Sequence, residues 1–243
     1  IKEDGTVLIP FVYDHLEAFD GKTVAIAKRN GKYGMIDDLN NEISAFVNDS
    51  ITRERFSDQY VLKNKGSYRF VTKNGKKKKD FAYDDMQACY YDEDRQFIVK
   101  KNNKYGMVTI EGTVLIPIVY DHVSNWVEYG PEAHFVTKAK KKGMYSRTGK
   151  ELLPPIYDEL MYYTDSCIVA ERDKKVGVID IYNKTIIPFQ YDEVLVDWYA
   201  TVMEYKTPEF YVLKDNTYQQ LNAQNKIIRA NVSKKEIEER FYN

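Results

Sequence analysis

Two nearly identical stretches of the chain restrict its fold more than any other feature. Residues Asp4 to His15 read DGTVLIPFVYDH, and residues Glu111 to His122 read EGTVLIPIVYDH. Self-similarity of this kind indicates tandem repeats, and a column of aspartates, usually preceded by Tyr, gives them a period of about 35 residues. The aspartates are Asp14, Asp49, Asp84, Asp121, Asp158 and Asp192. A short period of this length is typical of a propeller or a solenoid.

A second column, nine residues ahead of the aspartates, contains only Gly and Asn. These residue types tolerate positive φ, so the column predicts the left-handed residue of a tight hairpin turn. Residues 106–109 and 113–116, on either side of one such turn, are rich in strand formers. We therefore expect each unit to begin with a hairpin, to which we also assign Gly106 and its equivalents. The column consists of Gly5, Asn40, Gly75, Gly112, Gly149, Asn183 and Asn225.

Proline closes the second strand of the predicted hairpin in four units. Because Pro lacks an N–H, it should end the ladder there or confine the strand to a sheet edge. Two further stretches downstream, such as residues 122–128 and 134–140, are expected to add strands. Each unit should then contain about four short antiparallel strands. The prolines are Pro10, Pro117, Pro154 and Pro188.

These columns together resemble the WG-repeat family of bacterial proteins. Residues 103–108 and 31–36 match the start of its unit, and residues 116–121 and 187–192 match its middle. The chain departs from the family pattern in having no Trp-Gly pair, and Arg69 stands where Gly is expected. The resemblance implies a β-repeat architecture and little about function, because the biochemical role of the family is mostly undefined.

The repeat register divides the chain into units. Residues 1–30 hold only the later half of a unit and residues 217–232 only the earlier half, so pairing of the two would complete a sixth unit. We favour this all-β, closed, six-unit propeller-like array of antiparallel hairpin repeats over an open β-solenoid. The complete units are residues 31–66, 67–102, 103–141, 142–173 and 174–216.

The last residues, 233–243, are predicted to form a helix. Ser233 and Glu236 have the spacing of a capping box, and Ile237 and Phe241 lie one turn apart. Such a helix would pack across the last unit. It could also cap an open end, which keeps the solenoid as an alternative.

Composition narrows the partner classes. The net charge is -1, so a nucleic-acid partner is disfavoured, and no apolar run approaches the ~20 residues of a membrane span. Cys89 and Cys167 occupy different places in the repeat, which indicates neither a disulfide framework nor a metal site. The start at Ile1, without an initiator Met, favours a processed product that is exported or at the cell surface over a cytoplasmic one.

The residue pattern favours binding over catalysis. An aspartate in every unit suggests a turn role, in which the carboxylate accepts a backbone N–H, whereas a glycosidase needs two carboxylates in different environments. His15, His122 and His134 are too scattered in the repeat for a zinc site. We therefore expect no enzyme activity, no metal and no cofactor.

Aromatic residues five or six positions beyond the aspartates form a looser column. They could contact a partner, or they could pack between units. The lysines of 76–79 occupy a strand position, so that strand is predicted to be an exposed edge, with an anion contact as the sharper alternative. The aromatic column contains Phe19, Tyr90, Trp126, Tyr163 and Trp198.

The sequence thus predicts a non-enzymatic bacterial interaction module. It would bind a protein or a glycan through loops and aromatic side chains of a β-repeat scaffold. Two alternatives stay open. One is a carbohydrate-active hydrolase with carboxylates in the irregular stretches 128–132 or 204–209, and the other is a purely structural spacer.

Overall fold

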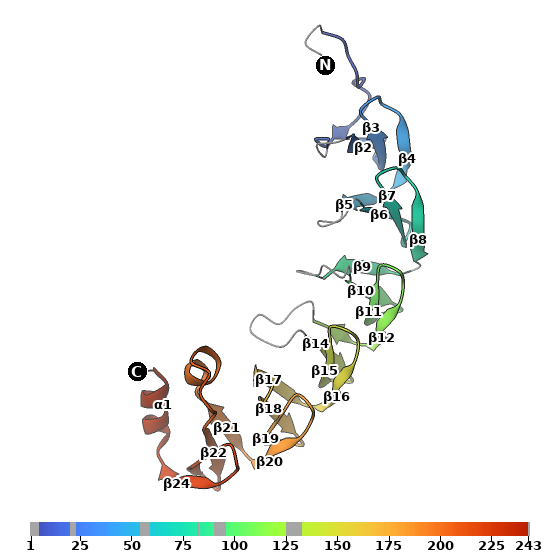
Figure 1. Ribbon diagram of the computed structural model, residues 1–243. Coiled ribbons are helices and arrows are strands. Elements are labelled where there is room, and N and C mark those ends of the chain that lie inside the picture. Colours follow the sequence, from blue (N-terminus) through green and yellow to red (C-terminus); the bar gives the residue numbers. More distant parts are fainter. Residues whose placement is uncertain are drawn as a thin grey trace. The chain divides into compact units, whose positions relative to one another are not determined.

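The computed structural model of the chain describes residues 5–19, 23–53, 59–81, 83–89, 96–124 and 133–242 (Figure 1). The fold is all-β. The described strands form separate four-stranded antiparallel sheets, and in each sheet every strand lies beside the next one in the chain. The chain divides into two compact units, Ile1–Asn103 with Met107–Val114, and Lys104–Gly106 with Leu115–Asn243.

The first three sheets are built from residues 15–120. The first sheet contains β1 (His15–Leu16), β2 (Val24–Arg29), β3 (Lys32–Asp37) and β4 (Glu42–Asn48). The second contains β5 (Ser50–Arg53), β6 (Gln59–Asn64), β7 (Ser67–Thr72) and β8 (Lys77–Phe81). The third contains β9 (Asp85–Ala88), β10 (Gln96–Lys101), β11 (Lys104–Thr109) and β12 (Val114–Tyr120).

The other three sheets and two helices follow. The fourth sheet contains β13 (His122–Val123), β14 (Ala133–Lys138), β15 (Lys141–Ser146) and β16 (Glu151–Tyr157). The fifth contains β17 (Glu159–Thr164), β18 (Cys167–Arg172), β19 (Lys175–Ile179) and β20 (Thr185–Tyr191). The sixth contains β21 (Glu193–Val196), β22 (Phe210–Lys214), β23 (Thr217–Leu221) and β24 (Ile227–Val232), with the π-helix η1 (Tyr199–Met203) between its first two strands and α1 (Lys234–Tyr242) after it.

The hairpin that opens each repeat in the sequence supplies the third and fourth strands of a sheet. The rest of the repeat supplies the first two strands of the following sheet, so the sheet and the sequence unit differ in phase. The prolines at 117, 154 and 188 lie inside fourth strands, and the fourth strand is a sheet edge in every case. β8, with its lysines, is one of these edges.

Pairing of the two chain ends, which the sequence favoured, does not complete the sixth sheet. β1 pairs with β2, and β24 pairs with β23 in a different sheet. The last sheet takes its fourth strand from the adjacent hairpin of residues 217–232, and closing a short loop costs less entropy than joining the ends of a long chain.

The Gly and Asn column adopts the left-handed conformation throughout, as predicted. All seven residues have positive φ, between 58° at Asn225 and 86° at Gly112. A further column, which the sequence analysis missed, lies three residues earlier and supplies side-chain acceptors for the turn. Asp37 Oδ1, for example, accepts hydrogen bonds from the N–H groups of Leu39 and Asn41 at 3.0 and 2.7 Å. The residues whose side chains accept such bonds are Asp37, Thr109, Ser146, Asp180 and Asn222.

The glycines within the third strands have another role than the one the sequence suggested. Gly106 and its equivalents Gly34, Gly143 and Gly177 are not turn residues, and their φ values are not positive. They lie where the fourth strand approaches closely: a Cβ at Gly177 would be 2.7 Å from the carbonyl oxygen of Ile187. Glycine is needed here because any side chain would displace the neighbouring backbone.

Apolar residues pack between successive sheets. Tyr60 and Leu62 of the second sheet pack with Ile26 and Met35 of the first, and comparable clusters join the fourth sheet to the fifth and the fifth to the sixth. The outer face of the sixth sheet is covered by α1, whose Ile237 is 1% exposed. The helix therefore caps the last sheet, as predicted, and Ser233 Oγ accepts the Glu236 N–H at its start.

Candidate partner-binding surface

The connections between strands lie at the two ends of each sheet, and the two ends differ. One end carries the two-residue turn between the second and third strands. The other end carries both the turn of the Gly and Asn column and the connection between the first two strands. That connection varies most: it is residues 165–166 in the fifth sheet and 197–209 in the sixth. In repeat folds such departures collect the recognition residues.

The connection in the sixth sheet is an ordered insertion containing η1. The Asp197 carboxylate accepts the Ala200 N–H at 2.9 Å, and the Asp197 carbonyl accepts the Thr201 N–H at 3.0 Å. Thr201 is buried, and Val202 packs against the core between the fifth and sixth sheets. One face of the insertion is therefore fixed to the scaffold.

Its far end is held by charged groups. Glu209 Oε2 accepts hydrogen bonds from Gln220 Nε2 of β23 and from Arg240 of α1, both at 2.8 Å. Lys206 Nζ lies 2.7 Å from Glu204 Oε2, a hydrogen bond that raises the pKa of the Lys206 ammonium. The two glutamates of this stretch are thus engaged in ion pairs with neighbouring cations.

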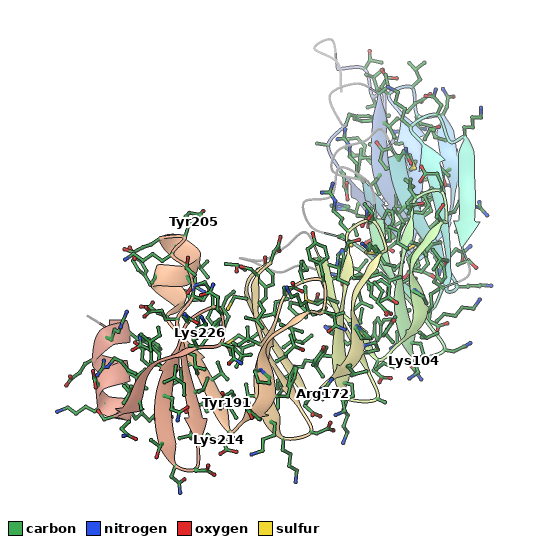
Figure 2. The ribbon with its side chains drawn as sticks, turned by 60° about the horizontal axis from the view of Figure 1, so that its bottom comes forward. Lys104, Arg172, Tyr191, Tyr205, Lys214 and Lys226 are labelled. Carbon is green, nitrogen blue, oxygen red and sulfur yellow. The ribbon has the colours of Figure 1, made fainter. Side chains whose placement is uncertain are left out.

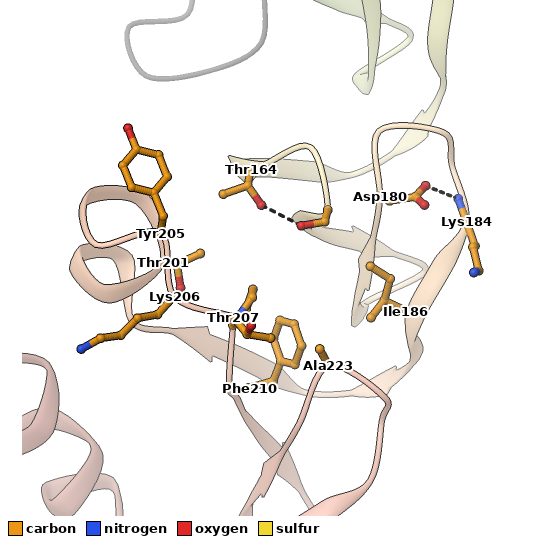
Figure 3. A pocket seen from close by; sticks show the side chains of 12 residues that line it. Thr164, Asp180, Lys184, Ile186, Thr201, Tyr205, Lys206, Thr207, Phe210 and Ala223 are labelled. Carbon is orange, nitrogen blue, oxygen red and sulfur yellow. Dashed lines mark hydrogen bonds between the residues drawn. The ribbon is translucent and has the colours of Figure 1, made fainter.

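The other face of the insertion exposes large side chains. Trp198 is 44%, Tyr199 59%, Met203 50% and Tyr205 89% exposed. Tyr205 has φ of 54°, a conformation that bulky residues rarely adopt, and its ring projects away from the insertion (Figure 3). We call these four side chains the insertion surface. Figure 2 shows Tyr205 at the opposite end of the sixth sheet from Lys214.

A pocket of about 490 Å³ lies beside the insertion surface, between the fifth and sixth sheets. Ile186, Phe210 and Ala223 give it an apolar lining, while Thr164 and Thr201 add hydroxyl groups (Figure 3). Its remaining lining residues are Ser166, Asp180, Lys184, Tyr205, Lys206, Thr207 and Pro208. A volume of this size fits one or two amino-acid side chains and falls within the range of binding pockets.

The predicted aromatic column divides between core and surface. Trp198 is exposed on the insertion, as a contact residue requires. Tyr163 is a core residue instead, because it is 9% exposed and packs with Cys167 and Val178 between two sheets. Phe19 is half-buried and packs with Ala25, Ala27 and Ile36 of the first sheet. Tyr90 and Trp126 lie outside the described residues.

Tyr199, Met203 and Tyr205 were not predicted from the sequence, although the stretch 204–209 was expected to be irregular. Their signal is compositional: large apolar residues recur in a stretch that lacks both strand alternation and turn residues. Trp198 was found only because it falls in the aromatic register.

The aspartate column joins neighbouring sheets. Asp158 Oδ1 lies 2.6 Å from Lys141 Nζ of the fourth sheet, and its Oδ2 accepts the Asp173 N–H from the two-residue turn of the fifth. The hydrogen bond from Lys141 holds the pKa of Asp158 below its usual value. Asp49 and Asp121 make the same pair of contacts. This is the predicted turn role, with a lysine contact added.

Other side chains that could be chemically reactive have environments typical of structural residues. Burial raises the pKa of the Cys167 thiol to about 12, which disfavours the reactive thiolate. The Nδ1 atom of buried His134 lies 2.9 Å from the carbonyl oxygen of Ser124. Over the residues that the structure describes, no three His, Cys, Asp or Glu side chains are grouped to hold a metal ion, and no helix could span a membrane.

A smaller pocket of about 240 Å³ lies in the first compact unit, beside β5 and β9. At its wall the Tyr68 hydroxyl donates a hydrogen bond to Asp85 at 2.8 Å, and Lys63 Nζ lies 3.6 Å from the same carboxylate. The hydrogen bond from Tyr68 lowers the pKa of Asp85. The Tyr68 hydroxyl, the Lys63 ammonium and the Asp85 carboxylate therefore satisfy one another's hydrogen-bonding and charge requirements.

Comparison with known proteins identifies the repeats. The model of the WG containing repeat matches residues 1–33 and 143–175. These two segments are similar to the WG repeat. No curated protein matches the chain.

Several solved structures match the chain at low sequence identity and low TM-score. A eukaryotic initiation factor is 7% identical over 90% of this chain and 65% of its own length, with a TM-score of 0.37. BamB from Moraxella catarrhalis is 14% identical over 88% and 72%, with a TM-score of 0.33. The AfRom2 CNH domain is 8% identical over 90% and 84%, with a TM-score of 0.35.

Proposed function

We propose that this WG-repeat chain is a non-catalytic interaction module that binds a protein partner through the insertion surface and its pocket. The observation that carries the proposal is the insertion itself, which is anchored on one face and exposes Trp198, Tyr199, Met203 and Tyr205 on the other. Large side chains on a fixed support contribute most of the energy in protein interfaces, because little entropy is lost when they bind.

The chemistry of the surface favours a protein over a glycan. Met203 is half-exposed and adds a flexible thioether to the aromatic rings, a combination enriched at protein interfaces. The neighbouring pocket has apolar walls at Ile186, Phe210 and Ala223 that suit an aliphatic or aromatic anchor side chain. Catalysis is disfavoured because Glu204 and Glu209 are both engaged by cations.

Photo-crosslinking tests the proposal before the partner is known. A benzophenone amino acid placed at Tyr205 should crosslink one protein in the native cells, whereas the same group at Lys214 should not. Lys214 is a matched control because it is exposed in the same sheet but lies at the opposite end from Tyr205 (Figure 2). Equal crosslinking at both positions, or none at Tyr205, would refute a site on the insertion.

Calorimetry with the purified partner then tests the energetics. Tyr205→Ala should weaken binding about 30-fold, equivalent to about 2 kcal/mol, while Lys214→Ala leaves it unchanged. Ala223→Trp, which places a large side chain in the pocket, should also weaken binding. If the chain bound a glycan on an array and the Tyr205→Ala variant did not, the partner of this surface would be a glycan and not a protein.

A further inference from the structure

The pocket beside the insertion surface contains a buried hydroxyl group. Thr201, within η1, lines the pocket but is only 3% exposed (Figure 3). Its backbone N–H donates to the Asp197 carbonyl at 3.0 Å, which holds the residue in place. Among the residues that the structure describes, the Thr201 hydroxyl makes no hydrogen bond, although its oxygen is not fully enclosed. The hydroxyl therefore opens into the pocket.

Other polar groups that line the pocket have partners or are exposed to water. Thr164 Oγ1 lies 3.2 Å from Ser166 Oγ. Asp180 Oδ1 accepts the Lys184 N–H at 2.8 Å within the turn between β19 and β20. Thr207 is exposed. The buried hydroxyl group is thus the one whose hydrogen bonding depends on what occupies the pocket.

This hydroxyl group discriminates between the side chains that enter the pocket. A side chain that fills the pocket excludes water from the hydroxyl, and a buried hydroxyl left without a hydrogen bond costs free energy. An occupant with an apolar tip incurs this cost, whereas an occupant whose tip donates or accepts a hydrogen bond avoids it. The pocket should therefore select a polar tip.

The walls of the pocket determine the rest of the occupant. Ile186, Phe210 and Ala223 present apolar surface, and the volume of about 490 Å³ accepts a large side chain. Short amide side chains have too little apolar surface to cover these walls. A charged tip is disfavoured because one neutral hydroxyl does not compensate for its loss of hydration. The occupant should combine a large apolar body with a neutral tip that forms a hydrogen bond.

We infer that the pocket receives a tyrosine side chain of the partner protein, with the phenol hydroxyl hydrogen-bonded to Thr201. The inference rests on the proposed function and specifies the anchor that the partner supplies. Tyrosine carries a neutral hydroxyl at the end of an aromatic ring and is one of the residues that dominate binding energy in interfaces. Tyr205 both lines the pocket and belongs to the insertion surface, so an anchored tyrosine is continuous with that surface.

Two small probes test the inference on the full chain. The probes are p-cresol and toluene, which reproduce the side chains of tyrosine and phenylalanine, and the methyl NMR signals of Ile186 and Ala223 report binding in the pocket. Although toluene is the more apolar probe, p-cresol should bind about tenfold more tightly, because it restores the hydrogen bond of the buried hydroxyl.

Three variants assign this preference to one hydroxyl. Thr201→Val keeps the shape of the side chain but removes its hydroxyl, and should abolish the preference for p-cresol. Thr201→Ser keeps the hydroxyl and should retain the preference. Thr164→Val is the matched control, because it removes a pocket hydroxyl that already has Ser166 as a partner, and it should also retain the preference.

The other outcomes overturn the inference. Equal or tighter binding of toluene, or no shift of either methyl signal with both probes, would show that the pocket does not select a phenol. A preference that survives in Thr201→Val would remove the role of Thr201, and tighter binding of 3-methylindole than of p-cresol would assign a tryptophan anchor.

Failure of the inference and failure of the proposed function are distinguishable. Crosslinking at Tyr205 without a preference for p-cresol would keep the insertion surface and overturn the tyrosine anchor. A preference for p-cresol without crosslinking at Tyr205 would contradict the protein partner and support the selectivity of the pocket for a phenol.

Discussion

The second and the fifth sheets share a strand order but treat their fourth strands differently. In the fifth, Val176 pairs with Tyr191 and Val178 with Ile187, so β20 bulges opposite Gly177. In the second, Tyr68 pairs with Phe81 and Phe70 with Lys79, so the ladder is regular opposite Arg69. The strand lengths are consistent with this difference, because the bulged strand β20 has 7 residues and β8 has only 5.

The sixth sheet is intermediate between these two. Tyr218 pairs with Val232 and Gln220 with Arg229, which leaves a smaller bulge opposite Gln219. The glycine of the WG-type dipeptide is thus coupled to a wide bulge in the facing strand, and a side chain at that place reduces or removes it. The Arg69 departure from the repeat pattern changes strand geometry but does not prevent the sheet from forming.

The largest expected effect comes from filling this glycine position in the fifth sheet. Gly177→Val should destabilise the chain by about 3 kcal/mol, because even its Cβ would lie 2.7 Å from the Ile187 carbonyl oxygen. Arg69→Gly, the reverse change in the second sheet, should cost less than about 1 kcal/mol. Urea unfolding of the two variants measures the difference. Equal losses would contradict the coupling of glycine to the bulge.

The two sheets also differ in the turn between their second and third strands. Gly66 has φ of 75° in the second sheet, whereas Lys174 has φ of 62° in the fifth. Lys174→Gly should stabilise the chain by up to about 1 kcal/mol, and Gly66→Lys should destabilise it by a similar amount, because glycine adopts this conformation with less strain than lysine. Thermal melts of the pair test the prediction, and it is wrong if the two changes shift the melting temperature in the same direction.

These two glycine roles show how far the sequence could be interpreted. The left-handed column was predictable because all seven of its residues are Gly or Asn, the types that tolerate positive φ. The two-residue turns were not found, because Ala139-Lys140 and Asp173-Lys174 adopt positive φ without carrying a glycine. Gly177 was misassigned because a glycine in a strand and a glycine in a turn repeat with the same period.

The surface was less predictable than the fold. Repetition locates the positions that build sheets, but Tyr163 and Trp198 share a register and differ in burial. The difference arises from the connection that follows: residues 165–166 are a tight turn that keeps Tyr163 in β17, whereas residues 197–209 carry Trp198 out of the sheet. A register cannot encode the path of an insertion.

A smaller effect is expected from substituting the aspartates that directly precede these sheets. Asp49 leads into the second sheet and Asp158 into the fifth, and a hydrogen bond from a lysine of the preceding sheet is the main cause that lowers the pKa of each. A carboxyl whose folded pKa is lowered stabilises the fold above its unfolded pKa, about 3.9, and loses that contribution as the pH falls through the folded value. Asp158→Asn should therefore lower the melting temperature slightly at pH 7 and leave it unchanged near pH 2. A difference that persists in acid would mean that charge is not the cause.

The smallest effect is expected from a substitution that supplies the lysine that the second sheet lacks. Lys32, Lys104, Lys141 and Lys175 each contact the aspartate at the start of the following sheet, whereas Ser67 holds the same place ahead of Asp84. Asp84 keeps the turn contact, since its Oδ2 accepts the Asn102 N–H at 2.7 Å. Ser67→Lys should therefore add about 0.5 kcal/mol, the usual contribution of an exposed ion pair, and the gain should shrink in 1 M salt. Ser67→Met is the matched control for the added methylene groups, and an equal gain from methionine at both salt concentrations would show that packing, not the ion pair, joins the two sheets.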